Sequence, residues 1–350
     1  MVVLKNIGNL PVDYRLEQNR RESFIKWYAW SLMYKDCDPA VWMTNYLNER
    51  YEHNTEQKLW LAWLYGNTYY LPTAWIIINE FPDFELATYD RMDAWNTENY
   101  KRLRYQNDTK WSKGHLPNMF KSYSEYVNGR EQWDAIATTF GDNEEQTFDN
   151  LYGVIKSDFY KFGRYSAWFY IQHLHSTCGV PAVPSTLLFN DYSGSRSHRN
   201  GFCFALGKDD WYDKKLTAGE YQWLEDSAKE MLQEMRVRFP SLTSDINPYT
   251  METALCAYKK LYRVRDGRYL GYYNDRVAGE IRKVEADGWN GIEWDVLWQA
   301  RDESLEPELA KSKIVDKGKM SSFVDGGEIA RLDWMFSEDA PIKVGLEDFM

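Results

Sequence analysis

Apolar side chains recur at helical spacing through almost the whole sequence, and this pattern limits what the chain can fold into. Two stripes show it best, one near the N-terminus and one in the second half of the chain. Segments with the two-residue alternation of strands are few. The spacing predicts a mostly α protein, built as one large globule or as two packed helical lobes. The stripes are Phe24, Trp27, Tyr28, Ser31 and Tyr34, and Tyr221, Leu224, Ala228, Met231, Leu232 and Met235.

Residues that typically begin or end helices separate the predicted helical segments. Asn54 with Gln57, and Thr217 with Glu220, have the spacing of capping boxes. Asn274 is expected to cap a helix over 275–286. Prolines suit the first turn of a helix because their missing N–H would have no partner there. Gly66 is expected to end the helix that Asn54 begins, and Asp83 to cap a later turn. The prolines in question are Pro39, Pro72 and Pro248.

The order of these segments suggests one main domain. A short lead over 1–14 precedes a helical domain over 15–303, and a charged, glycine-containing tail occupies 304–350. A chain of 350 residues is long enough for one large or two ordinary domains. No internal repeat is found, so a solenoid is excluded.

Net charge and cysteine content narrow the classes of protein. The formal net charge of −11 excludes a protein that coats nucleic acid through a uniformly basic surface, but it allows a local basic cleft. The four cysteines are far apart and form no CxxC pair, so a disulfide framework is not expected. No signal peptide and no apolar run of about 18 residues is present. We expect a soluble protein that acts inside the cell, with no membrane partner.

Most of the candidate chemistry lies between Phe159 and Gly207. This central segment holds three of the five histidines. It has four basic residues against one acidic residue, although the chain as a whole is acidic. Such a local reversal of charge, among aromatic and small residues, is typical of a site for an anionic ligand. The basic residues are Lys161, Arg164, Arg196 and Arg199, and the acidic one is Asp191.

Two arginines in the sequence NDYSGSRSHRNG suggest a phosphate site. On a helix, Arg196 and Arg199 would share a face, and two guanidinium groups there can hold a phosphate or pyrophosphate. Gly163 can present free amides at a helix start, and Arg164 adds a charge. The alternative is a solvated loop whose Asp191 only caps a turn.

Candidate acids and bases lie in and beyond the same segment. Asp191 and His198 are candidates for proton transfer, and Glu252 sits among apolar residues where it could face the same cleft or merely form an ion pair. Asn67 and Tyr69 lie near acidic residues that could bind an amine. Candidate substrate contacts are Asn190, Ser193, Ser195, Tyr69 and Asn67.

A metal or other cofactor is not expected. His173 and His175 with Cys178 offer soft ligands, but positions two apart on a helix point in different directions. No second Cys/His pair has zinc-finger spacing.

Several blocks together resemble the phage amino acid:DNA transferases, also described as α-glutamyl/putrescinyl-thymine pyrophosphorylases. They are YGNTYYLPTAWIIINEFPDF, FYKFGRYSAWFYIQHL, VPSTLLFNDYSGSRSHRNGFC, METALC and YYNDR, and they extend over roughly 15–300. The resemblance implies a fold like that of helix-hairpin-helix DNA glycosylases, with FGRYSAW as the hairpin and Asp191 as the catalytic aspartate. Asp191 follows Gly163 by 28 residues, farther than in glycosylases.

The resemblance also implies a reaction. A kinase, itself a candidate partner, first pyrophosphorylates 5-hydroxymethyl-uracil in double-stranded phage DNA. The transferase then replaces pyrophosphate on the base methylene with an amine, such as an amino acid or putrescine, after base flipping. The host cytoplasm is the implied location.

Two other functions remain open. A DNA glycosylase acting on a modified pyrimidine would leave abasic sites and release no pyrophosphate. A non-catalytic module that binds modified DNA would show affinity without turnover.

Overall fold

The computed structural model describes residues 17–107, 109–191, 195–260 and 271–304. These residues form fourteen α-helices with short 3-10 turns, and no strand occurs among them. The prediction of a mostly α fold is confirmed. The predicted lead 1–14, and the tail 304–350 beyond its first residue, lie outside the described residues, so the domain boundaries remain predictions.

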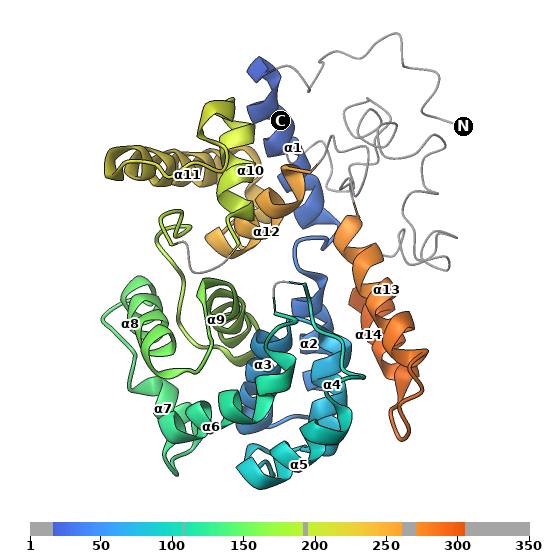
Figure 1. Cartoon of the computed structure of the whole chain (residues 1–350). Coiled ribbons are helices and arrows are strands. Elements are labelled where there is room, and N and C mark those ends of the chain that lie inside the picture. Colours follow the sequence, from blue (N-terminus) through green and yellow to red (C-terminus); the bar gives the residue numbers. More distant parts are fainter. Residues whose placement is uncertain (1–16, 108, 192–194, 261–270, 305–350) are drawn as a thin grey trace, which may run out of the picture.

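Eight helices form the lower body of the molecule in Figure 1. The helix α3, buried from Leu59 onward, packs closely along α9, and the other six pack on this pair or on one another. They are α2 (Pro39–Arg50), α3 (Thr55–Thr68), α4 (Leu71–Glu80), α5 (Tyr89–Asn99), α6 (Leu116–Val127), α7 (Gln132–Ala137), α8 (Glu144–Asp158) and α9 (Arg164–Cys178).

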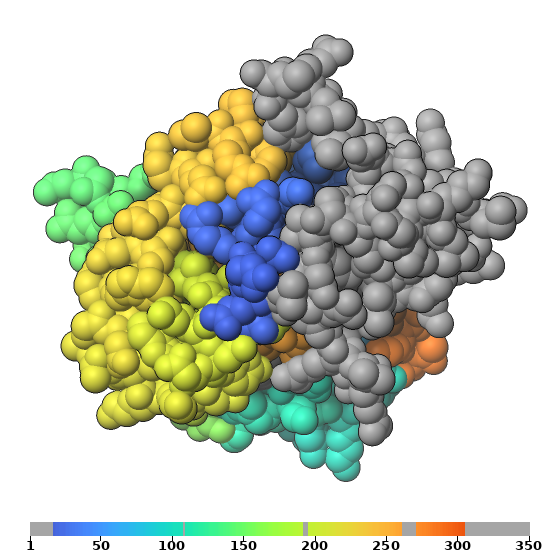
Figure 2. All heavy atoms as spheres, turned by 90° about the horizontal axis from the view of Figure 1, so that it is seen from above, coloured from blue at the N-terminus to red at the C-terminus, as the bar shows by residue number. Residues whose placement is uncertain are grey.

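The remaining helices lie above and beside this body. Four of them form an upper group, in which Figure 2 shows α1 (blue) against the yellow and gold helices that follow the site. The last two run beside α2 and α4. The upper group is α1 (Arg20–Met33), α10 (Ser197–Ala205), α11 (Ala218–Arg238) and α12 (Pro248–Tyr258), and the lateral pair is α13 (Tyr272–Glu285) and α14 (Trp294–Ser304).

Two glycines allow helices to approach each other unusually closely. A Cβ at Gly66 would stand 2.5 Å from Cβ of Tyr170, and one at Gly201 would stand 2.1 Å from the carbonyl oxygen of Leu255. The prediction that Gly66 ends its helix is wrong, because α3 runs on to Thr68. Gly66 is there for the contact between α3 and α9, and Gly201 for the contact between α10 and α12.

The predicted helix starts are confirmed where both partners are local. Capping boxes form at Asn54 and Thr217. Asn274 does not cap this helix, because α13 already begins at Tyr272. The backbone N–H of Asn274 instead donates to buried Asp36 at 2.9 Å. Asp83 likewise makes no cap hydrogen bond with its side chain, which accepts from Gln57 Nε2 at 3.0 Å.

The connection between α8 and α9 is the segment for which a helix-hairpin-helix was predicted. Residues 159–163 join the two helices, and Gly163 is the N-cap of α9. Closer kinship with DNA glycosylases stays a prediction. None of the described helices is both long enough and apolar enough to cross a membrane.

Candidate active site

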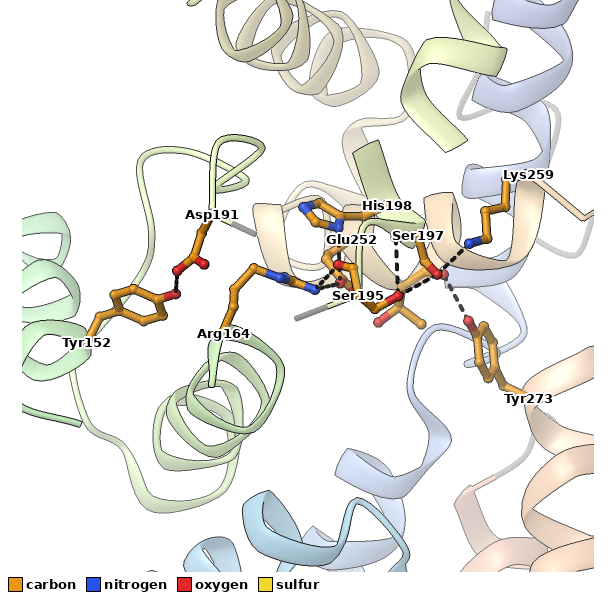
Figure 3. A network of polar contacts seen from close by, with 10 residues as sticks. Tyr152, Arg164, Asp191, Ser195, Ser197, His198, Glu252, Lys259 and Tyr273 are labelled. Atoms are coloured by element: carbon orange, nitrogen blue, oxygen red, sulfur yellow. Dashed lines mark hydrogen bonds and ion pairs between the residues drawn. The ribbon is translucent and has the colours of Figure 1, made fainter. Parts of the chain in front are cut away.

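A buried polar cluster joins the lower body to the upper group (Figure 3). Arg164 at the start of α9 donates from Nη2 to Glu252 Oε1 on α12 at 3.2 Å. His198 on α10 lies with Nδ1 3.7 Å from the same oxygen. All three side chains are at most 1% exposed. The cluster therefore fixes three helices against one another at a single point.

The charges in this cluster follow from its burial. Burial raises the pKa of Glu252, and the Arg164 guanidinium beside it opposes that rise. Burial, followed by the charge of Arg164, holds the pKa of His198 well below its usual range. His198 is therefore a neutral imidazole at neutral pH, stacked on Phe189 at 5.4 Å between ring centroids.

The same guanidinium also holds the segment that enters α10. Arg164 Nη2 donates to the backbone oxygen of Ser195 at 3.1 Å. Ser195 Oγ donates to Ser197 Oγ at 2.7 Å, and Lys259 Nζ donates to the same hydroxyl. Ser197 at the start of α10 is therefore contacted by Ser195, which Arg164 of α9 holds, and by Lys259 at the end of α12.

Asp191 lies on the other side of Arg164 in Figure 3. Its carboxylate accepts from the Tyr152 hydroxyl at 2.5 Å and from Lys156 at 3.5 Å, and the side chain is 21% exposed. Burial, and then the Asp191 carboxylate, raise the pKa of Tyr152 well above its usual range. Tyr152 therefore keeps its proton as a donor. Among the predicted acids and bases, Asp191 is reachable by solvent, whereas His198 and Glu252 are enclosed.

The two arginines of the predicted phosphate clamp occupy different environments. Arg196, the exposed N-cap of α10, donates to the Asp213 carbonyl at 3.3 Å. Arg199 is 0% exposed and donates to the Tyr221 hydroxyl at 3.1 Å. Arg164 is equally enclosed. These two buried arginines cannot touch a phosphate in this conformation, so the expected pairing of Arg196 with Arg199 is corrected.

Lys259, which the sequence did not single out, is the second cation beside Arg196, where Arg199 was expected. Lys259 and Arg196 line one cavity of about 400 Å³, together with the hydroxyls of Ser195 and Ser197. The N-terminus of α10 opens at Ser197, where backbone amides favour an anion. We call this cavity the cradle. Its other lining residues are Asn200, Tyr212 and Asp213.

Ser197 also lines a much larger cavity of about 1040 Å³, which we call the basic pocket. Its walls come from the segment 101–113 and from α13, and cations outnumber carboxylates. The cations are Lys101, Arg102, Arg104, Lys110, Lys113, Lys260, Arg276, Arg282 and Lys283, and the carboxylates are Asp275, Glu280 and Asp287. The stretch 101–113 holds five cations against one carboxylate, whereas α13 holds three of each, and the sequence alone does not show that these two segments face the same cavity.

Arg276, one of the cations of the basic pocket, is held in place by a carboxylate and two aromatic rings. Arg276 Nε donates to Glu280 at 2.6 Å, and its guanidinium lies 5.0 Å from the centroid of the Tyr69 ring and 5.8 Å from that of Tyr273. Tyr69, a predicted substrate contact, is 4% exposed. In this structure its ring supports Arg276.

The other predicted residues are scattered. Asn67 is buried, with Nδ2 3.2 Å from Met119 Sδ, and Asn190 is exposed next to Asp191. Ser193 lies outside the described residues. His173 stacks on Tyr65 at 3.9 Å. In the described part of the chain, no three His, Cys, Asp or Glu side chains are grouped to hold a metal ion.

Comparison with known proteins assigns the chain to a family. The family model described as "Amino acid:DNA transferase" matches residues 25–268, which include the whole cradle and the whole buried cluster. A protein of Salmonella phage ViI named "Serinyltransferase" is 28% identical over 347 residues, covering 91% of this chain and 84% of its own. No solved structure matches the chain. The chain belongs to the amino acid:DNA transferase family.

Proposed function

We propose that this transferase replaces the pyrophosphate on a pyrophosphorylated 5-hydroxymethyl-uracil in DNA with an amine. The observation that carries the proposal is the pair of adjoining cavities that share Ser197. One is large and basic within a chain of net charge −11, and the other is small and places two cations beside a helix N-terminus. The first suits a nucleic acid backbone and the second suits a compact anion.

The basic pocket is the proposed DNA-binding surface. Lysine and arginine side chains neutralise backbone phosphates, and this term supplies most of the affinity of non-specific DNA binding. The chain concentrates nine cations around one cavity although carboxylates outnumber cations overall. DNA would therefore be attracted to this face and repelled by the others.

The cradle is the proposed site of the pyrophosphate. Arg196 and Lys259 offer positive charges, Ser195 and Ser197 offer hydroxyl groups, and the cavity lies at the N-terminus of α10. These groups stabilise the charge that develops as the leaving oxygen takes the electron pair of the broken C–O bond. Arg199, enclosed behind them, positions α10 through Tyr221.

Asp191 is the proposed base. An attacking amine must be neutral, and the new C–N bond leaves a nitrogen that has to release a proton. Asp191 is the accessible one of the three predicted acids and bases, and its contacts with Tyr152 and Lys156 hold it in place. It lines neither cavity, so the proposal requires the amine to approach from the side of Arg164 on which Asp191 lies. His198 and Glu252 are enclosed and act by fixing Arg164 and the start of α10.

The amine and the supply of substrate are further parts of the proposal. The name of the phage ViI relative makes serine the first amine to test, with putrescine and glutamate as alternatives. The DNA must first be pyrophosphorylated by a kinase, and the transferase would meet it in the cytoplasm of an infected host. Base flipping would bring the methylene carbon to the junction of the two cavities.

The experiment is product analysis after incubating pyrophosphorylated duplex DNA with the protein and a panel of amines. Mass spectrometry of the nucleosides should show an amino-linked thymine together with one released pyrophosphate. Abasic sites without pyrophosphate would indicate the glycosylase function, and tight binding without product would indicate a binding module.

A matched pair of variants tests the base. Asp191→Asn should lower the single-turnover rate by about 10²- to 10⁴-fold. Raising the pH should restore part of the rate, because more of the amine is then neutral in solution. Asp226→Asn, at an exposed position of α11, is the control and should leave the rate unchanged. A near-native rate for Asp191→Asn rules out this assignment.

A further inference from the structure

Two large aromatic side chains project from the surface beside the basic pocket. Trp111 is 50% exposed and Tyr160 is 43% exposed. Lys161 joins them, with Nζ 5.1 Å from the centroid of the Trp111 ring and 5.6 Å from that of Tyr160. The His115 ring meets Tyr160 edge-on at 6.1 Å. We call these two rings the aromatic edge.

Each ring of the aromatic edge lies on a connection between helices. Trp111 lies between Lys110 and Lys113, which line the basic pocket. Tyr160 belongs to the connection 159–163, and its amide donates to Ser122 Oγ at 2.8 Å. That connection leads directly into α9 and Arg164. The rings therefore stand between the proposed DNA-binding surface and the element that carries the buried cluster.

A comparison within the molecule shows what distinguishes this edge. Trp223 is 44% exposed and packs edge-on against Trp211 at 5.5 Å, with Lys208 near both rings. Two carboxylates, Asp209 and Asp210, follow Lys208 in the sequence. Trp111 instead has a lysine before it and another two residues after it, and both line a cavity. An exposed aromatic pair with cations around it is suited to stacking on nucleobases beside a phosphate backbone.

We propose that Trp111 and Tyr160 stack on the bases that are left without a neighbour when the target nucleotide leaves the duplex. This inference rests on the proposed function, since that reaction requires an extruded base. Opening the duplex costs a few kcal/mol of stacking and pairing. Aromatic rings that replace the lost stacking offset that cost, as inserted side chains do in proteins that kink DNA. Single-stranded DNA needs no such compensation.

The test compares duplex and single-stranded substrates of the same sequence in single-turnover reactions. Trp111→Ala and Tyr160→Ala should each lower the duplex rate by about tenfold or more, the range expected for losing one stacked base. The rate on single strands should change by less than about twofold. Trp111→Phe, which keeps a ring, should recover most of the duplex rate. Trp223→Ala is the control for removing an exposed tryptophan and should change neither rate.

A readout that does not need turnover accompanies the rates. With 2-aminopurine in place of the target base, binding of the full-length protein should raise the fluorescence as this base leaves the stack, and the alanine variants should lose most of this rise. Equal loss of rate on both substrates, or no loss of rate and of fluorescence on the duplex, overturns the proposal. If the natural sequence opens the duplex but makes no amino-linked product, the proposed reaction fails while the stacking surface stands.

Discussion

Breaking the Arg164–Glu252 ion pair should destabilise the protein far more than breaking a similar pair on the surface. Both side chains are 0% exposed, and their charged atoms lie 3.2 Å apart. Glu252→Leu leaves a guanidinium in the interior without that carboxylate. Removing one partner of a buried pair typically costs about 3–5 kcal/mol. For a chain of this size, that corresponds to a fall in Tm of about 6–10 °C, at about 2 °C per kcal/mol.

The double variant separates the ion pair from packing. Arg164→Met alone should also cost about 3–5 kcal/mol, because Glu252 then loses its cation. Arg164→Met with Glu252→Leu should cost only about 1–3 kcal/mol, mainly because the Ser195 carbonyl loses its donor. The free energies of the single changes should therefore not add.

An exposed pair provides the control. Arg238 and Glu22 lie 2.7 Å apart with side chains 34% and 43% exposed, and their coupling should be about 0–1 kcal/mol. Thermal unfolding of all variants under the same conditions supplies the comparison. If the two changes at Arg164 and Glu252 are simply additive, or if Glu252→Leu costs less than about 1 kcal/mol, the structural role given to this pair is wrong.

Three further predictions concern pH, packing and DNA binding. Burial raises the pKa of Asp38 to about 7, so its stabilising contribution is full below the unfolded pKa near 4 and is lost as the pH rises to about 7. Asp38→Asn should thus gain in Tm relative to the natural sequence between pH 5 and pH 7.5; a constant difference would argue against the shift. Gly201→Ala should cost about 1–3 kcal/mol in thermal unfolding, because the new methyl would meet the Leu255 carbonyl at 2.1 Å; an unchanged Tm would contradict the close approach. Changing Arg282 and Lys283 together to Glu should weaken DNA binding for all sequences and lower the slope of log K against log salt by about 1 or more, which a titration at several salt concentrations would measure.

Local signals made part of the fold predictable. A capping box at Asn54 or Thr217 is set by residues three apart, so the sequence contains both partners. Gly66 shows the limit. Its reason for being glycine is the approach of Tyr170 from another helix, and nothing near Gly66 in the sequence reveals that contact. Asn274 was misassigned for the same reason, because its partner is Asp36.

The sequence indicated which segment contributes to the candidate site, but not how the side chains of that site are arranged. The central segment 159–207 does contribute Asp191, Arg196 and the start of α10. Helical spacing could not show that Arg199 points into the interior, since that depends on Tyr221 arriving from α11. Lys259 reaches Ser197 only because α12 packs on α10, and the basic stretch 101–113 meets the cations of α13 only in the folded chain.

The proposed cradle is tested most directly by Arg196→Ala combined with Lys259→Ala. Pyrophosphate release and amino-linked product should be measured together in single turnovers on pyrophosphorylated duplex DNA, with DNA affinity measured in parallel. We predict one pyrophosphate per product for the natural sequence. For the double variant we predict a rate lower by at least about 10²-fold, with little change in DNA affinity and no such effect from Lys121→Ala, a change at an exposed position of α6. A near-native rate in the double variant would contradict the proposal that these two cations receive the leaving group.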